Sequence, residues 1–246
     1  MEEQDSAAEL LEYLEGFLTG TRKKRILEIL NQRTRYITPV LEDLVDPHNS
    51  SACLRSAEAC GLQDIHIIEN RHAFQVKSGV SMGSAHWLTL RRYRAEIAES
   101  AEIASIRASA TERCFATLRE EGYIIYATTP HRSSISLPEM DLSRPAAIVF
   151  GSEKDGISAY ARENADHCLQ IPMYGFTESF NISVCAAITL YSLSQKLRQS
   201  EIPWQLSESQ KQHIRLQWAR HSLKRSDLLE ANFRTIAKKR QSPGKP

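Results

Sequence analysis

AIVFGSEKDGIS, residues 147–158, leads from an apolar strand through a tight turn into the start of a helix. Gly151 ends the apolar run and Gly156 precedes the next helical segment, so the backbone of this turn can come close to a ligand. The turn is not a Walker phosphate loop, because G-K-[ST] is absent, nor a dinucleotide fingerprint, because G-x-G-x-x-G is absent. Residues 147–158 therefore predict a strand–turn–helix unit of an α/β domain.

Strands and helices alternate on both sides of this unit. We expect strands at five short runs, 39–44, 65–69, 123–128, 146–150 and 168–171. We expect helices at 50–60, 93–121, 157–164 and 178–197, with Gly61 and Gly122 where C-terminal caps belong. Short strands separated by helices favour a layered α/β domain with a mainly parallel sheet.

A second polar stretch, VDPHNSSACLRSAEACG at residues 45–61, follows the first predicted strand. Loops at the carboxyl ends of parallel strands are where α/β proteins usually bind ligands. Asn49 or Ser50 is a suitable N-cap for the helix, and Arg55 lies on its first turn and a half. On its own, this pattern is typical of an amphipathic helix with one solvated arginine.

A third stretch, IPMYGFTESFNISVCAAITL at residues 171–190, carries a strand end and a glycine loop into an apolar helix of small residues. Ser179 and Asn181 enter that helix. Neither a Ser-His-Asp order nor a G-x-S-x-G elbow accompanies Ser179, so on its own it suits a helix cap better than a nucleophile.

Together and in this order, the three stretches resemble motifs 1, 2 and 3 of the SpoU/TrmH family of SPOUT methyltransferases, the trefoil-knotted RNA 2′-O-ribose methyltransferases. The matching segments are NSSACLRSAEACG, FGSEKDGIS and IPMYGFTESFNISVCAA, and the resemblance covers about residues 38–198. It implies a parallel-sheet α/β knot, a deep trefoil knot, in a catalytic domain at 38–200. Helical extensions would then occupy 1–37 and 201–246.

The resemblance also implies S-adenosyl-L-methionine as the cofactor, held in the knot by loops and largely through backbone groups. The residues expected to line its pocket are Thr128, Gly151, Ile171 and Phe180. The expected catalytic set is Asn49, Arg55, Glu153, Ser179 and Asn181. Phe180 stands where the family usually has Leu, which matters little if the backbone makes the contact.

Methyl transfer to a ribose hydroxyl is an in-line displacement, so most of the catalysis should be positioning. In the family, the residue matching Arg55 is proposed to act at the 2′-hydroxyl. A guanidinium stays protonated near neutral pH and is a poor base, so this role needs help from a gripped substrate phosphate. Alternatively, Arg55 holds that phosphate and stabilises the developing alkoxide. Asn49 would orient Arg55 or the ribose, and Glu153 would act chiefly as an orienting carboxylate.

Charge is distributed unevenly although the net charge is only +1. Residues 1–21 sum to −6, 22–45 to +3, 46–210 to −4 and 211–246 to +8. This asymmetry suggests a polyanionic partner met by the ends of the chain. The basic residues expected to track RNA phosphates are Arg22, Lys23, Lys24, Arg25, Lys211, Arg215, Lys224 and Arg225.

Within the family, three short segments and the basic ends resemble members that methylate the ribose 2′-OH of guanosine 18 in the tRNA D-loop. These segments are DPHN (46–49), GSAHW (83–87) and MDLSRP (140–145). The alternatives are another tRNA position, ribosomal RNA, or a non-catalytic RNA-binding relative. The last is disfavoured because all five residues of the expected catalytic set are present. The resemblance also implies a homodimer in which Arg55 faces the cofactor loops of the other subunit.

Other classes of protein are disfavoured by composition. Five widely spread cysteines without C-x-x-C make a disulfide framework or a zinc site weak hypotheses, and we expect no metal. Because no apolar run approaches the roughly 20 residues of a membrane span, we expect no membrane association. The acidic N-terminus lacks the basic flank of a signal peptide, so we expect a cytoplasmic protein.

Overall fold

The computed structural model describes residues 2–95, 109–130 and 134–241. The chain divides into two compact units. The central unit is Thr34–Trp204, and the end unit combines the described residues of Met1–Arg33 with those of Gln205–Pro246. The two terminal extensions that the sequence predicts separately thus belong to one unit.

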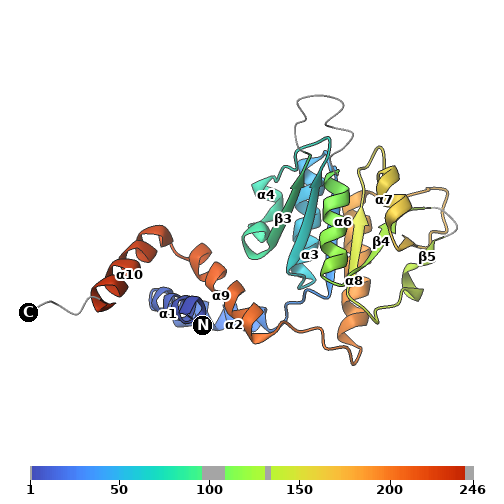
Figure 1. Ribbon diagram of the computed structural model, residues 1–246. Helices are drawn as coiled ribbons and strands as arrows, with labels where there is room; N and C mark the ends of the chain where they lie inside the picture. Colours follow the sequence, from blue (N-terminus) through green and yellow to red (C-terminus); the bar gives the residue numbers. More distant parts are fainter. Residues whose placement is uncertain (1, 96–108, 131–133, 242–246) are drawn as a thin grey trace, which may run out of the picture. The chain divides into compact units, whose positions relative to one another are not determined.

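Parallel strands form the seven-stranded sheet of the central unit, in the order β3-β2-β1-β6-β4-β7-β5 (Figure 1). The strands are β1 (Ile37–Glu42), β2 (Asp64–Glu69), β3 (Thr89–Arg94), β4 (Ile124–Thr128), β5 (Ile135–Ser136), β6 (Ala146–Phe150) and β7 (His167–Gln170). Every residue of β1, β2 and β6 is buried. Burial on both faces explains why these strands are apolar without alternation.

Helices cover both faces of this sheet. α3 (Pro47–Ala59) and α8 (Ile182–Arg198) pack on one face, while α6 (Ala110–Glu120) and α7 (Ala159–Asn164) pack on the other (Figure 1). The short helices are α4 (Ser78–Ser81), η1 (Ser84–Trp87) and η2 (Leu137–Glu139). The predicted parallel α/β architecture is confirmed. No helix in the described ranges is both long and apolar enough to span a membrane.

The predicted helix over 93–121 is wrong at its start, because Tyr93 and Arg94 belong to β3. The helix α6 begins at Ala110, capped by the Ser109 side chain, and residues 96–108 lie outside the described residues. β3 escapes prediction because its sequence, TLRRYR, has no apolar run. It is an edge strand whose arginines pair with buried acids of β2, Arg91 with Asp64 and both Arg92 and Arg94 with Glu69. The two-residue strand β5 was not predicted either.

In the described residues of the end unit, the chain forms the helices α1 (Glu2–Glu15), α2 (Gly20–Leu30), α9 (Glu208–Ser222) and α10 (Ser226–Gln241). Leu11 and Leu14 of α1 pack with Leu216 and Ala219 of α9. The Arg215 guanidinium also donates hydrogen bonds to both carboxylate oxygens of Glu15, Nε to Oε1 and Nη2 to Oε2, the second at 2.6 Å. Part of the acidic first segment therefore folds against the basic C-terminal segment.

The first two helices meet at a different residue from the one expected. The sequence predicts a stop at Gly20 and a cap at Thr21, but α1 ends at Glu15 and Gly20 opens α2. The cap is Thr19, whose side chain accepts from the backbone N–H of Arg22 at 3.2 Å. Threonine at either position satisfies the preference for a short oxygen side chain at a helix start, which is why sequence alone misplaces it.

His66 is a fully buried histidine on β2. Its Nδ1 lies 3.0 Å from the Tyr93 hydroxyl, and its Nε2 has no hydrogen-bond partner among the described residues. Burial, with a smaller contribution from the charge of Arg91, lowers the pKa of His66 to about 3 from its ordinary 6.5. Between these two pH values the imidazole is therefore neutral in the folded protein and protonated in the unfolded chain.

We expect the free energy of unfolding to fall by about 2 kcal/mol between about pH 7.5 and about pH 5, because only the unfolded chain binds a proton at His66 in that window. Urea denaturation at the two pH values measures this loss. A His66→Gln variant should be less stable at the higher pH but should show a flatter pH dependence. The control is His72→Gln at an exposed histidine, and equal pH slopes for the two variants would contradict the assignment to His66.

Candidate active site

A cavity of about 430 Å³ opens at the carboxyl ends of β4, β6 and β7, beside the start of α8. Thr128, Gly151, Ile171 and Phe180 all line it. The structure thus brings together the four residues that the sequence predicts for cofactor binding. The cavity volume falls in the range of about 300–1,000 Å³ that is typical of small-molecule sites.

The 151–158 turn forms one wall of this cavity. Ser152 and Gly156 exchange two backbone hydrogen bonds of 3.0 Å each, which closes the turn on itself. A Cβ atom at Gly151 would lie 2.1 Å from the carbonyl carbon of Gly156, and Gly156 itself has a φ of +67°. Gly151 is therefore required by the close approach of the turn's own backbone.

α3 is capped one turn earlier than the sequence suggests. The Asp46 carboxylate accepts from the His48 backbone N–H at 2.8 Å, and Pro47 occupies the first helical position. Neither Asn49 nor Ser50 is the cap, so that expectation is wrong. The early cap leaves the Asn49 amide free to reach other segments.

Asn49 joins the three polar stretches. Its Nδ2 donates to Glu153 Oε1 at 2.6 Å, and its Oδ1 accepts from Asn181 Nδ2 at 3.3 Å. Glu153 lies in the 151–158 turn and Asn181 lies directly before α8, so three segments far apart in the sequence meet at one side chain. Both Glu153 and Asn181 line the cavity.

Asn181 is the N-cap of α8, which begins at Ile182 rather than at the predicted residue 178. Its Oδ1 accepts from the backbone N–H of Ser183 at 2.9 Å and from the Ser183 hydroxyl at 2.6 Å. This cap orients the amide, so that its Nδ2 is turned toward Asn49. Ser179 is not the cap; it lies in the exposed loop before the helix and lines the cavity.

Arg55 lies on α3 away from this hydrogen-bonded group. It is six residues beyond Asn49, which turns its side chain about 120° around the helix. The side chain is exposed and makes no hydrogen bond or ion pair within the described part of the chain. A single chain therefore assembles Asn49, Glu153 and Asn181, with Ser179 on the same cavity, but leaves Arg55 on a separate surface.

Two cysteines, the buried Cys53 and the partly buried Cys185, lie close to the site. Burial raises the pKa of Cys53 to about 12 and that of Cys185, which lines the cavity, to about 11. Both thiols therefore stay protonated near neutral pH, which makes them poor nucleophiles. In the ranges described, no group of three or more His, Cys, Asp or Glu side chains could hold a metal ion.

The sequence matches the SpoU rRNA Methylase family over residues 37–191. The chain is also 38% identical over 226 residues to the tRNA (guanosine(18)-2′-O)-methyltransferase of Borreliella burgdorferi, covering 92% of this chain and 97% of that protein. The chain belongs to the SpoU methylase family. The matched residues span all three polar stretches of the site.

Solved structures of SpoU methylases share the fold. The TrmH/SpoU tRNA modifying enzyme of A. aeolicus superposes with a TM-score of 0.68 at 26% identity, over 83% of this chain and 98% of that one. The SpoU methyltransferase AviRb of Streptomyces viridochromogenes, solved in complex with the cofactor AdoMet, gives a TM-score of 0.54 at 21% identity over 71% and 65% of the two chains.

Several features of this SpoU methylase site were not predicted from its sequence. The Asp46 cap could have been predicted, because Asp followed by Pro is a usual pattern for an N-cap and the first helical residue. Gln170 and Met173 also line the cavity, at and just beyond the end of β7. Their position at the carboxyl end of a predicted parallel strand could have identified them.

The basic residues predicted to contact RNA fall into two groups in the end unit. The first group is exposed and consists of Arg22, Lys24 and Arg25 on the first two turns of α2 and Lys224 and Arg225 in the turn after α9. The neighbouring Lys23 is half-buried. Lys211 and Arg215 are half-buried and pair with acids, Lys211 with Glu208 at 2.8 Å and Arg215 with Glu15. In the exposed group, Arg25 pairs with Glu28 at 3.5 Å. The charge of the second group is partly neutralised within the fold.

Gly151→Ala should lower the free energy of unfolding by about 1–3 kcal/mol or more, because the new methyl group meets the backbone of Gly156. Chemical denaturation measures the loss. Gly175→Ala is the matched control, since its Cβ would meet only the Thr177 hydroxyl at 3.9 Å. An alanine at residue 151 that is as well tolerated as one at residue 175 would contradict the described turn.

Proposed function

We propose that this protein is an S-adenosylmethionine-dependent tRNA methyltransferase that methylates the ribose 2′-OH of guanosine 18. The Borreliella burgdorferi relative that carries this name is 38% identical to this protein over 92% of the chain. The observation that carries the proposal is the joined Asn49, Glu153 and Asn181 group on the rim of a cavity of cofactor size.

The residues present fit S-adenosylmethionine, which supplies the methyl group when bound. Ile171 and Phe180 offer apolar contact for adenine and ribose, and the 151–158 turn presents backbone groups to the cavity. Gly151 allows the backbone of this turn to fold closely on itself, in the shape that lines the cavity. Thr128 is already engaged, because its hydroxyl donates to the Val149 carbonyl at 2.8 Å, so its oxygen can only accept further bonds.

The chemistry asks this chain to align the 2′-oxygen and to favour loss of its proton. Preorganised donors at a developing negative charge are among the strongest catalytic contributions that a protein makes. Arg55 would hold the substrate phosphate and stabilise the alkoxide as it forms, because its guanidinium presents several donors in a fixed plane. Asn49, Glu153 and Asn181 would hold the site in its working geometry, and Ser179 would complete the polar edge of the cavity.

We also propose that the protein works as a homodimer through α8. Val184, Ile188 and Tyr191 recur at helical spacing and leave an exposed apolar stripe on this helix, with Tyr191 62% exposed. An exposed apolar stripe of this kind suits a self-complementary two-fold contact. A second subunit would also explain how Arg55, which is remote from Asn49 in its own chain, could reach a cofactor cavity.

We propose that RNA is held mainly by the end unit. Its exposed basic side chains would contact RNA phosphates without recognising the nucleobases, so tRNA affinity should fall steeply as the salt concentration rises. These side chains are Arg22, Lys24, Arg25, Lys224 and Arg225. A salt-independent affinity would argue against this role. A tRNA substrate also favours the cytoplasm, which fractionation of cells that produce the protein would test.

We infer that the central unit contains the trefoil knot of its family. α8 packs on α3 and β1, whereas the strand before it, β7, lies beyond β4, so the chain must return across the sheet. Lys196 of α8 donates to the carbonyls of Pro138 and Met140, which belong to the β4–β6 connection. This contact supports a passage of the chain through that connection. A crystal structure in which residues 182–198 do not pass through a loop of the chain would contradict the knot.

The decisive experiment incubates the protein with labelled S-adenosylmethionine and unmodified tRNA and then locates the modified ribose. Label at guanosine 18 is the expected result. Label at another tRNA nucleotide, or label only in a parallel reaction with unmodified ribosomal RNA, would replace the substrate assignment. Binding of tRNA without transfer to either RNA would indicate a non-catalytic relative.

Arg55→Ala should reduce methyl transfer by at least about a hundredfold, because removal of one preorganised donor costs about 10²–10³ in rate. Calorimetry should give nearly the same affinity for S-adenosylmethionine, since Arg55 does not line the cavity of its own chain. The exposed Arg162→Ala, on α7, is the matched control and should retain activity. Near-normal turnover in Arg55→Ala would remove this residue from the catalytic set.

Ile188→Glu should convert the dimer to monomer, because a carboxylate on the apolar stripe would be buried without a partner. Sedimentation equilibrium distinguishes the two states. Gln199→Glu, at the exposed end of the same helix, should leave the dimer intact. Wild-type protein that sediments as an active monomer would refute the dimer.

A further inference from the structure

Glu42 is a buried carboxylate at the carboxyl end of β1, with only 1% of its surface exposed. Three donors meet it. Oε1 accepts from the Thr111 hydroxyl at 2.7 Å and from the Ser158 hydroxyl at 2.8 Å, and Oε2 accepts from the Ser158 backbone N–H at 2.8 Å. Ser158 is both the last residue of the 151–158 turn and the N-cap of α7.

The direction of each bond follows from the other partners of the two hydroxyls. The Ser158 oxygen already accepts from the Ala161 backbone N–H at 3.1 Å, and the Thr111 oxygen accepts from Asn70 Nδ2 at 2.8 Å. The Asn70 amide is oriented in turn, because its Oδ1 accepts from the Ala110 N–H at 3.1 Å. Each hydroxyl therefore directs its own proton to Glu42, which serves as an acceptor only.

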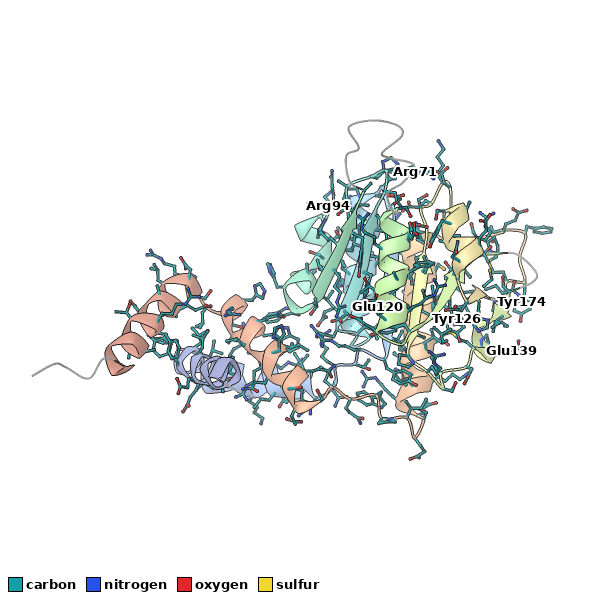
Figure 2. The ribbon with its side chains drawn as sticks, in the orientation of Figure 1. Arg71, Arg94, Glu120, Tyr126, Glu139 and Tyr174 are labelled. Atoms are coloured by element: carbon teal, nitrogen blue, oxygen red, sulfur yellow. The ribbon has the colours of Figure 1, made fainter. Side chains whose placement is uncertain are left out.

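The 151–158 turn has two fixed ends. Its first residue follows β6 directly, and its last residue is held by Glu42 from the neighbouring strand β1. Between these ends the turn supplies five residues of the cavity wall, Gly151, Ser152, Glu153, Gly156 and Ile157. Asp155 of the turn also pairs with Arg71 at 3.3 Å, and Arg71 lies at the same end of the sheet as Arg94 (Figure 2). Both side chains of this pair are exposed, and exposed ion pairs contribute little to stability.

We infer that Glu42 is a positioning residue for cofactor binding: it fixes the far end of the 151–158 turn and thereby the shape of the cavity wall. This role rests on the proposed function, because it takes S-adenosylmethionine as the ligand of that cavity. Glu42 does not line the cavity, so it acts through Ser158 rather than by contact.

A glutamine at residue 42 cannot replace the carboxylate. If its NH₂ takes the place of Oε2, it meets the Ser158 backbone N–H, donor against donor. If its NH₂ takes the place of Oε1, both hydroxyl protons lose their acceptor, because an amide NH₂ donates hydrogen bonds and does not accept them. Either arrangement leaves buried donors unsatisfied and disturbs the turn.

The test compares Glu42→Gln and Ser158→Ala with Glu69→Gln. Glu69 is a matched control, since it is a buried carboxylate at the end of the neighbouring strand β2 and accepts from Phe74, Arg92 and Arg94 without touching the 151–158 turn. Calorimetry with S-adenosylmethionine gives Kd, steady-state methylation gives KM and kcat, and thermal denaturation gives stability.

We expect Glu42→Gln and Ser158→Ala to raise Kd and KM for S-adenosylmethionine about fivefold or more, with kcat at saturation within about twofold of wild type. Glu69→Gln should lose stability but keep the wild-type Kd. Ser158→Ala removes a hydroxyl from a half-buried residue and decides the matter if Glu42→Gln does not fold.

Two results would overturn the inference: wild-type Kd in both Glu42→Gln and Ser158→Ala, or a Glu69→Gln variant weakened as much as they are. Wild-type protein that binds no S-adenosylmethionine would instead contradict the proposed function, and with it this role of Glu42. The wild-type titration therefore separates the two failures.

Discussion

The hydrogen bonds of one side-chain amide hold the candidate site together. Asn49 donates to Glu153 and accepts from Asn181, and these three residues come from three separate connections of the sheet. An amide is suited to this position because it offers a donor and an acceptor about 2 Å apart, whereas a carboxylate offers only acceptors. The arrangement depends in turn on Asp46, which caps α3 and relieves Asn49 of that duty.

The parallel sheet explains why such distant residues can meet. All strand pairs are parallel, so the connections that follow β1, β4, β6 and β7 emerge at one edge of the sheet. Order at that edge comes from helix caps as much as from the strands. Asn181 caps α8 and Ser158 caps α7, and each side chain also takes part in the contacts that shape the cavity wall.

The sequence predicts the five central strands well, because buried parallel strands are apolar, and the four residues that it assigns to the cofactor all line the cavity. It fails where charge replaces apolar pattern. β3 is held by Arg91, Arg92 and Arg94 against buried acids that lie 23 to 27 residues earlier, and no local window contains both partners. The prediction of the α3 cap fails for a different reason. Asp46, Asn49 and Ser50 all have side chains that can cap a helix, and only tertiary contacts select among them. Arg55 lies on a face of α3 that stays exposed after folding. The spacing of apolar residues does not predict which functional residues share a face with it.

The end unit cannot fold until both of its segments, which lie at opposite ends of the sequence, have been synthesised. Arg215 follows Glu15 by 200 residues, and Leu11 and Leu14 find their apolar partners only in α9. During synthesis the central unit emerges complete while α1 and α2 still lack these contacts. The first helices must therefore remain soluble until α9 has been synthesised, and the six acids of residues 1–21 give this segment a like charge that opposes association of its apolar helix.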